Sequence, residues 1–432
     1  MKKVGWMALP ASLFVLAACG GDSDQTSGGE GDQTVLEMYS WRTEDRSAYE
    51  KLIEEFENQH PDITINFQPY DSTEYNTILT NSLVSGQGPD IAQLRPYSGV
   101  QTIADNGYLV SLDDVPGVSD LEDAYLDAAR GSDGSIYGVP LTLNSGVIFY
   151  NESIFEEQGL AIPETYDELL EVSQQLQAND IIPIAQGGRD AYLLSMVHGV
   201  IAPSAYGGNT LVEELLDGTI DLTDERLLAS LERLEELSEY FPQDFIALDD
   251  NDAQAMFYAE EAAMYINGDY RLETFASNIP DVPVGVIPSL GIDEDPAERP
   301  VMTWVDGSYG VVESSDKQEE ALLFMEFMAT QEFGQLFTDT FNRLSPIEGV
   351  TPEHETVQYI SENADEASTP YLMLVHFGNG SPTTKTIFED ALQGMFLGEI
   401  TKEEVLEEAQ ANNERAQQEE PEELEMVDED DD

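Results

Sequence analysis

Short segments with strand character alternate with amphipathic helical segments along most of this chain. Residues 63–67 alternate apolar and polar side chains, as a strand with one buried face does. Further strand candidates lie at residues 35–41 and 90–94, and one helical face between them carries Tyr49, Leu52, Ile53 and Phe56. This order of elements is typical of α/β proteins with largely parallel sheets, and it is the fold class that we predict.

Two further helices have recognisable starting signals. Thr165 and Glu168 have the spacing of a capping box, in which each side chain bonds to a backbone amide at the start of the helix. Ser315 and Gln318 have the same spacing before another periodic apolar segment. We therefore expect one helix to begin at Thr165 and another at Ser315.

The start of the chain has the parts of a secretory signal. Two lysines precede an apolar run at residues 4–18, which is shorter than the roughly 20 residues of a membrane-spanning helix. The run ends in Leu-Ala-Ala before Cys19, which resembles the lipobox of bacterial lipoproteins. The resemblance implies a signal peptide at residues 1–18, lipid on Cys19, a flexible tether at 19–34 and attachment to the outer face of the cell membrane. The alternatives are a secreted protein with a chance cysteine and an uncleaved anchor helix.

The composition limits both the compartment and the partners. Cys19 is the only cysteine, so an extracellular form with lipid on it must be stabilised by its hydrophobic core rather than by disulfides. The chain has 17 Lys and Arg against 87 Asp and Glu, a net charge of −70, which excludes nucleic acid as a partner. A strongly anionic ligand is disfavoured too, although a local arginine pocket could hold one. This acidity favours a salt- or alkali-adapted bacterium, and residues 416–432 are expected to form a disordered acidic tail.

Several ordered segments resemble the family 1 extracellular solute-binding proteins, the ligand-capture subunits of bacterial ABC importers for sugars. They are residues 49–115, 133–151, 163–176, 262–270 and 308–328. The first of these segments begins with YEKLIEEFENQHPDITINFQPYDSTEYNTILTNSLVSGQGPDIAQL, and the fourth reads AAMYINGDY. Together these segments cover most of the chain between residues 35 and 415.

The resemblance implies a two-lobed fold like that of the periplasmic binding proteins, of the type II-like kind, with a hinge between the lobes and a ligand cleft at their interface. We place the first lobe at residues 35–143 and 300–332, and the second at 144–299 and 333–415. The function implied is capture of a mono- or oligosaccharide by hinge closure, and its delivery to the membrane permease of an ABC importer. We expect a monomer with no cofactor, no metal and no catalytic activity.

Sugar sites combine aromatic platforms with planar polar side chains, so such residues at predicted strand ends are candidates for ligand binding. Trp41 and Arg42 follow the first strand, and Arg95 and Tyr97 follow the third. Each has a structural alternative, since a tryptophan at a strand end is often core and an arginine often belongs to a salt bridge. Asn144 lies at the expected crossover, where a turn is its alternative role.

The second half of the chain holds the remaining candidates. Tyr270 occupies a place where many relatives have a stacking tryptophan, and Asp269 and Arg271 flank it. Trp304 and Asp306 lie at the expected return to the first lobe, with Trp304 as a second stacking candidate. Weaker candidates complete the set: Gly188, in a glycine turn after a strand, Arg343 and Phe377.

Three other functions remain open. An extracellular glycosidase would need two suitably spaced carboxylates, and with 87 acidic residues the sequence alone cannot select them. A receptor of the same fold could bind a non-sugar solute, or report its ligand to a membrane sensor.

Residues 249–252 read Asp-Asp-Asn-Asp, which suggests calcium, but the glycine of a calcium loop is absent and a solvated acidic loop is the interpretation that we favour. The four histidines lack metal-ligand spacing.

Overall fold

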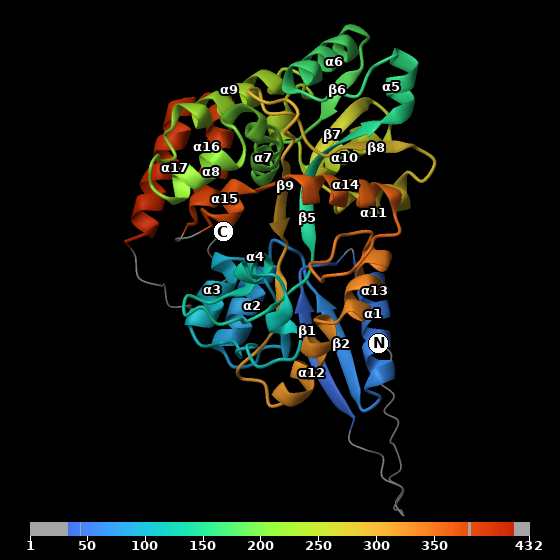
Figure 1. The fold of residues 1–432 in the computed structure, drawn as a ribbon, viewed down its shortest axis with the longest axis vertical. Coiled ribbons are helices and arrows are strands. Elements are labelled where there is room, and N and C mark those ends of the chain that lie inside the picture. The colour runs from blue at the N-terminus through green and yellow to red at the C-terminus, as the bar shows by residue number, and fades with distance from the viewer. Residues whose placement is uncertain (1–32, 44, 379–381, 419–432) are drawn as a thin grey trace, which may run out of the picture.

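Two β-sheets organise the chain, and each forms the centre of one lobe (Figure 1). The structure is a computed structural model that describes residues 33–43, 45–378 and 382–418. The first sheet has five strands in the order β2-β1-β3-β10-β4. The second has six strands, of which five run in the order β11-β9-β5-β7-β6 while β8 pairs with β5. The predicted two-lobed α/β fold is confirmed, but the expectation of largely parallel sheets is wrong. Both sheets are mixed, because β5 runs antiparallel to β7, β8 and β9, and β10 runs antiparallel to β3 and β4.

The first lobe combines the beginning of the described chain with a later return. Its strands are β1 (Thr34–Ser40), β2 (Ile63–Pro69), β3 (Ile91–Leu94), β4 (Val139–Pro140) and β10 (Ser308–Val311). Its helices are α1 (Arg46–Gln59), α2 (Tyr75–Val84), α3 (Ser98–Asp105), α4 (Asp123–Leu126), α12 (Gln318–Met328) and α13 (Gln331–Phe341), with 3-10 turns at Val118–Asp120 and Asp127–Ala129. β1 is parallel to both β2 and β3, whereas β10 runs antiparallel to β3.

The core of the first lobe follows from the helical face seen in the sequence. The four apolar residues of α1 are the buried ones: Tyr49, Leu52, Ile53 and Phe56. The Tyr49 ring stacks on Phe67 of β2 at a centroid distance of 4.6 Å, and Phe56 packs edge-on against Phe324 of α12 at 5.0 Å. Burial of these aromatic rings joins α1 and α12 to the sheet.

The second lobe holds the rest of the described chain. Its strands are β5 (Leu143–Asn151), β6 (Ile182–Ala185), β7 (Ala262–Gly268), β8 (Val284–Ile287), β9 (Val301–Val305) and β11 (Ser368–Pro370). Its helices are α5 (Glu152–Gln158), α6 (Tyr166–Ala178), α7 (Tyr192–Tyr206), α8 (Asn209–Leu216), α9 (Glu225–Ser238), α10 (Asp250–Tyr258), α11 (Arg271–Asn278), α14 (Glu355–Glu366), α15 (Leu372–Val375), α16 (Thr384–Leu397) and α17 (Lys402–Ala416), with a 3-10 turn at Phe245–Ala247.

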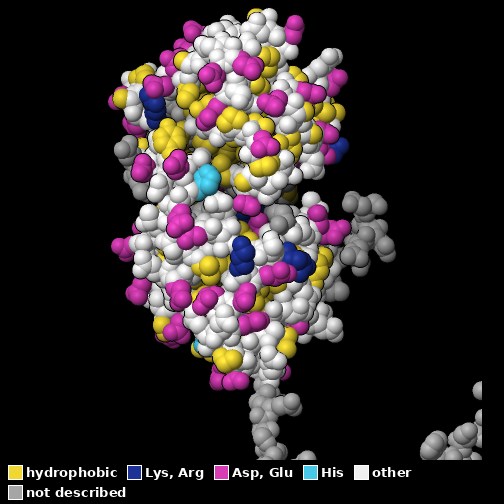
Figure 2. Space-filling model, turned by 90° about the vertical axis from the view of Figure 1, so that its right-hand side faces the viewer, with side chains coloured by type: hydrophobic (Ala, Val, Ile, Leu, Met, Phe, Trp, Pro, Cys, Tyr) yellow, Lys and Arg dark blue, Asp and Glu magenta, His cyan; other side chains and the backbone are white. Residues whose placement is uncertain are grey.

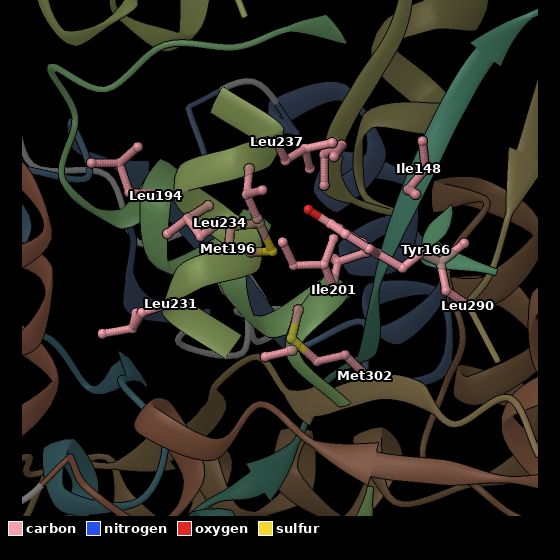
Figure 3. Close-up of a cluster of buried hydrophobic side chains, with 14 of the residues drawn as sticks. Ile148, Tyr166, Leu194, Met196, Ile201, Leu231, Leu234, Leu237, Leu290 and Met302 are labelled. Atoms are coloured by element: carbon pink, nitrogen blue, oxygen red, sulfur yellow. The ribbon is translucent and has the colours of Figure 1, made fainter. Parts of the chain in front are cut away.

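The core of the second lobe centres on α7, which is apolar around most of its circumference. Figure 3 shows side chains of α7, α9 and the sheet converging, among them Met196, Ile201, Leu234 and Met302. The Tyr166 hydroxyl lies in the same cluster and donates to the carbonyl oxygen of Arg233 at 2.7 Å. Because α7 buries both faces, it lies between the sheet and the outer helices α9 and α16 (Figure 1).

Three neighbouring backbone segments form the hinge between the lobes: residues 141–143, 305–307 and 343–345. The amide of Leu141 donates to the carbonyl oxygen of Gly307 at 3.0 Å, and the amide of Asp306 donates to that of Thr142 at 3.0 Å. The amide of Leu143 donates to the carbonyl oxygen of Leu344 at 3.0 Å. Backbone hydrogen bonds thus tie the three crossings into one narrow strip, and the molecule has a waist at this level (Figure 2).

Two elements, β9 and α13, lie in the other lobe from the one that we predicted for them. We placed residues 300–332 in the first lobe, but β9 pairs with β5 and β11 in the second sheet, and the chain crosses only after Val305. We placed residues 333–415 in the second lobe, but Phe333, Phe337 and Phe341 of α13 belong to the first core. The reason is the apolar face of α13, which packs against α1 before the chain crosses back.

The helix starts agree in part with the capping signals. Thr165 is the N-cap of α6, and its side chain accepts a hydrogen bond from the Glu168 amide. The Glu168 carboxylate accepts from the amide of Glu164 at 2.7 Å instead of from the amide of Thr165. The helix expected at Ser315 begins at Gln318, and Ser315 accepts from the Lys317 amide at 3.0 Å. The difference arises because Ser315 also donates to Asp90 at 2.6 Å, which holds it in the preceding turn.

The predictions for the two ends of the chain fall mostly outside the described residues. The signal at 1–18, Cys19 and the tether up to residue 32 lie outside them, and so does the acidic tail from residue 419. Thr34, which we assigned to the tether, is the first residue of β1, and Ala416, assigned to the tail, ends α17. None of the helices in the described part of the chain has the length and apolarity required to cross a membrane.

Candidate ligand site at the hinge

The carboxyl ends of β1 and β3 form the edge of the first lobe that faces the second lobe. Because these strands are parallel neighbours, Trp41 and Arg42 after β1 lie beside Arg95 and Tyr97 after β3. Gly307 in the hinge touches this group, since a Cβ at that position would lie 2.7 Å from Cη2 of Trp41. The structure therefore brings four of the sequence-predicted residues together next to the hinge.

Trp41 is buried, with 3% of its surface exposed. The guanidinium of Arg95 lies over the indole ring, with Cζ 4.1 Å from the ring centroid, and Tyr75 packs edge-on at 5.4 Å. The contact with Arg95 has the geometry of a cation–π interaction. One face of the indole is thus occupied by a cation, so Trp41 supports Arg95 in this structure rather than offering that face to a sugar.

Tyr97 has an unusual backbone conformation, with φ 58° and ψ −117°. Such a positive φ is rare for an aromatic residue and is costly unless neighbouring contacts maintain it. The Tyr97 amide donates to the carbonyl oxygen of Ala128 at 2.9 Å, and its hydroxyl accepts from the Val305 amide at 3.5 Å. Burial raises the pKa of Tyr97 to about 12, so the phenol stays neutral and joins the first lobe to the hinge.

Two sequence-predicted arginines form ion pairs beside the hinge. Arg42, which follows β1, pairs with Asp306, another predicted residue, which lies at the first crossing back from the second lobe. Arg343 binds Asp45 through two contacts, Nη1 to Oδ2 at 2.8 Å and Nη2 to Oδ1 at 3.2 Å. Paired contacts of this kind fix the orientation of both side chains. They hold the start of α1 and the end of β1 against the hinge.

Two buried polar groups lie where β5 and β7 reach the hinge. Asn144 of β5 lies opposite Trp304 of β9, and its Nδ2 has no hydrogen-bond partner among the described residues. Asp269 follows β7, its amide donates to the carbonyl oxygen of Ser145 at 2.8 Å, and its Oδ1 likewise has no partner there. Burial raises the pKa of Asp269 to about 7. Because unsatisfied buried polar groups are rare, these two are strong candidates for ligand contacts.

Tyr270 is oriented by a polar network beneath it. Its hydroxyl donates to Oδ1 of Asn267 at 2.6 Å, and Nδ2 of Asn267 donates to Asp250 at 3.2 Å. Asp250 also accepts from the Tyr265 hydroxyl at 2.5 Å and forms an ion pair with Arg271. Tyr270 is partly buried, as Tyr97 is, whereas Trp41, Trp304 and Phe377 are buried.

The interpretation of residues 249–252 as a solvated acidic loop is wrong. Asp249 is the N-cap of α10 and forms a capping box with Asp252, so the segment starts a helix. Asp250 is buried and is the centre of the network under Tyr270. The three-residue spacing of Asp249 and Asp252 was the available signal, whereas the long-range partners of Asp250 on β7 and α11 could not be seen in the sequence.

Three predicted residues lie in packed positions of the second lobe. Trp304 is 5% exposed and packs edge-on against Tyr371 at 5.5 Å, and Phe377 is buried in the same core. Gly188 donates to the carbonyl oxygens of Phe245 and Leu248 at 2.9 and 3.1 Å. A side chain at Gly188 would meet Ile246 at 2.9 Å, so this glycine serves close backbone packing.

A pocket of about 630 Å³ lies between the lobes. Tyr97 and Arg130 line it from the first lobe, and Asn209, Glu213 and His376 line it from the second. Of the sequence-predicted residues only Tyr97 takes part. The sequence analysis missed the other pocket residues because they come from loops and helix ends that no sequence pattern connects. Within the described residues, no cluster of His, Asp and Glu is arranged to hold a metal ion.

Comparisons with known proteins agree with this architecture. The profile of the family described as "Bacterial extracellular solute-binding protein" matches residues 39–335. The chain is similar to a multiple sugar-binding protein of Streptococcus mutans serotype c, with 24% identity over 81% of this chain and 83% of the relative. It is also similar to a melibiose/raffinose/stachyose-binding protein of Bacillus subtilis, with 21% identity over 76% of this chain and 77% of the relative.

The fold is shared with a solved chitin oligosaccharide binding protein. The TM-score is 0.75 and the identity 23%, with 90% of this chain and 100% of that chain covered. At this identity the likeness establishes the fold alone, whereas the profile match spans most of the chain and both sides of the hinge. This protein therefore belongs to the family of bacterial extracellular solute-binding proteins.

Proposed function

We propose that this protein captures a carbohydrate outside the cell and delivers it to the permease of an ABC importer. The observation that carries the proposal is the family membership, established over residues 39–335. The names of two relatives support the ligand class, since one is a multiple sugar-binding protein and the other binds melibiose, raffinose and stachyose. The site at the hinge offers the groups that sugar hydroxyls require.

The ligand in this proposal contacts both lobes at the hinge. Asp269 supplies a buried carboxyl oxygen that can accept from a sugar hydroxyl, and Asn144 supplies an amide donor. Tyr270 supplies an aromatic face, fixed by its bond to Asn267. Since these groups come from β5 and β7 while Arg95 and Tyr97 come from the first lobe, a ligand held by both favours the closed arrangement of the lobes.

Binding without catalysis is the activity that we propose. A glycosidase needs two carboxylates free to act as acid and as base or nucleophile. Three of the carboxylates near the hinge are instead engaged in ion pairs: Asp45 with Arg343, Asp250 with Arg271 and Asp306 with Arg42. The fourth carboxylate at the hinge is Asp269, whereas Asp127 and Glu213 line the pocket between the lobes, so the test below also follows the breakdown of each sugar.

The location that we propose is the outer face of the cell membrane, with a lipid anchor on Cys19 and a monomeric body. The lipobox-like sequence before Cys19 supports the anchor, and the extracellular family supports the side of the membrane. Acidic side chains are spread over both lobes of the face seen in Figure 2. A net charge of −70 suits a surface that remains hydrated in concentrated salt, which supports adaptation to a saline or alkaline habitat.

Thermal melting of residues 33–418 against a panel of mono- and oligosaccharides tests this function. A sugar present at 100 times its dissociation constant should add about 2.7 kcal/mol to the free energy of unfolding. Chromatography of each sugar after the measurement shows whether it is intact. Stabilisation by an intact sugar supports a receptor, consumption of the sugar would identify an enzyme, and no stabilisation by any sugar would contradict the proposed ligand class.

A further inference from the structure

Arg95 differs from the other arginines at the hinge because no carboxylate among the described residues pairs with it. Arg42, Arg271 and Arg343 each form an ion pair with an aspartate. Among the described residues, the hydrogen bonds of the Arg95 guanidinium go only to Asn76 and Ser72. The chain has 87 acidic and 17 basic residues, so it is a distinctive feature that an arginine next to the ligand site lacks an acidic partner in the part that the structure describes.

Neutral groups hold Arg95 in place without neutralising it. Its Nε donates to Oδ1 of Asn76 at 3.3 Å, and one terminal nitrogen donates to the carbonyl and hydroxyl oxygens of Ser72, both at 3.0 Å. The indole of Trp41 supports the flat face of the guanidinium. The other terminal nitrogen makes no hydrogen bond within the described part of the chain, so its two N–H groups remain available as donors.

The surroundings of Arg95 favour an additional negative charge. The residue follows β3 at the edge that faces the second lobe, two positions before Tyr97, which lines the pocket between the lobes. Partial burial and the nearby positive charge of Arg42 lower the pKa of Arg95 to about 10. Both effects are unfavourable for the cation, and an anion bound at the free edge of the guanidinium would relieve them.

We propose that the carbohydrate ligand is acidic, and that Arg95 binds the carboxylate of a uronic acid residue. The planar carboxylate matches the donor geometry of a guanidinium, and a hydrogen bond between charged partners is stronger than one to a neutral hydroxyl. This inference rests on the proposed carbohydrate function. It narrows the ligand class to uronic acids and uronate-containing oligosaccharides, and it gives Arg95 the role of specificity-determining residue.

Isothermal titration calorimetry with matched sugars tests the inference. The probes are D-galacturonate with D-galactose, D-glucuronate with D-glucose, and the disaccharides of each. We expect at least one acidic sugar to bind about tenfold or more tightly than its neutral counterpart, in line with the usual strength of charged hydrogen bonds. The variant Arg95→Gln should remove this preference, while Arg95→Lys should keep part of it because the charge is retained.

The control variant is Lys402→Gln, which removes one positive charge from α17 and its contact with Glu235. It should leave both affinities within about twofold, since exposed ion pairs contribute little. Three results would overturn the inference: a neutral sugar that binds as tightly as its acid, an equal loss of both affinities in Arg95→Gln, or equal behaviour of Arg95→Gln and Lys402→Gln. If none of these sugars binds but the melting panel identifies a neutral oligosaccharide, the inference fails and the carbohydrate function stands. If the melting panel identifies no sugar either, the carbohydrate function itself fails.

Discussion

The two walls of the hinge site hold their polar side chains in different ways. On the first-lobe wall, charged residues face the hinge directly, as Arg42 and Arg343 do in their ion pairs with Asp306 and Asp45. On the second-lobe wall, the ion pair of Asp250 and Arg271 acts through Asn267 on Tyr270. One wall has its ion pairs at the hinge itself, whereas the other uses an ion pair to position the neutral phenol of Tyr270.

This difference determines how easily the side chains of each wall can move when a ligand binds. A side chain that depends on a connected buried network has few alternative positions, because every group in the network would lose a partner if it moved. Arg95, held by neutral groups and by the Trp41 ring, can change partners at a smaller cost. We therefore expect the second-lobe wall to recognise hydroxyl geometry and the first-lobe wall to recognise charge.

Removal of Asp250 should have the largest effect on stability. The variant Asp250→Ala leaves Arg271 without its carboxylate and removes the acceptor for Tyr265 and Asn267. The loss of one partner from such a buried pair typically reduces the free energy of unfolding by about 3–5 kcal/mol. Urea denaturation measures this change. The control variant Asp252→Ala removes only a capping contact, so its free energy of unfolding should decrease by about 1 kcal/mol. Equal losses in the two variants would refute the central role of Asp250.

Replacement of Asp269 should stabilise the protein in a pH-dependent way. The folded pKa of about 7 lies above the ordinary value of 3.8 for an aspartate, so the unfolded chain loses the proton first. The free energy of unfolding therefore decreases as pH rises from about 4 to about 7 and is level above that range. Asp269→Asn removes this dependence and should add at most about 4 kcal/mol above pH 7, and nothing below pH 4.

Denaturation of wild type and Asp269→Asn at several pH values between 4 and 9 measures this difference. A difference in the free energy of unfolding between the two proteins that does not change with pH would contradict the raised pKa of Asp269. The same variant should weaken sugar binding if Asp269 accepts a hydroxyl, so affinity and stability are expected to change in opposite directions.

Disruption of the ion pair on the first-lobe wall should have a smaller effect than the loss of Asp250. In Asp306→Asn the asparagine can still accept from Arg42, and the side chain of Asp306 is 19% exposed, so water can reach the pair. We expect a loss of about 1–2 kcal/mol in the free energy of unfolding, measured by urea denaturation. A loss as large as that of Asp250→Ala would show that the two walls are equally dependent on buried charge, and would remove the contrast between them.

The sequence predicted the parts of the molecule that depend on local periodicity. The four apolar residues of α1, the strand at 63–67 and the N-cap at Thr165 are where their patterns placed them. The lobe boundaries were less accurate, since the side of the hinge on which β9 and α13 lie is decided by long-range pairing and packing. The roles of Trp41 and Asp250 depend on Arg95 and Arg271, partners that no spacing rule relates to them.

The smallest effect on stability is expected for Tyr270→Phe, which tests whether the network acts on the ligand site. The variant removes one hydrogen bond, from the Tyr270 hydroxyl to Asn267, and should reduce the free energy of unfolding by about 1 kcal/mol. Tyr166→Phe is a matched control, because its hydroxyl donates to the Arg233 carbonyl at 2.7 Å from α6, at the end of the second lobe far from the hinge (Figure 1). Calorimetry with the sugar identified by melting should show weaker binding for Tyr270→Phe alone. If both variants bind the sugar as the wild type does, the Tyr270 hydroxyl has only a structural role, and the second-lobe wall must recognise its ligand through Asn144 and Asp269.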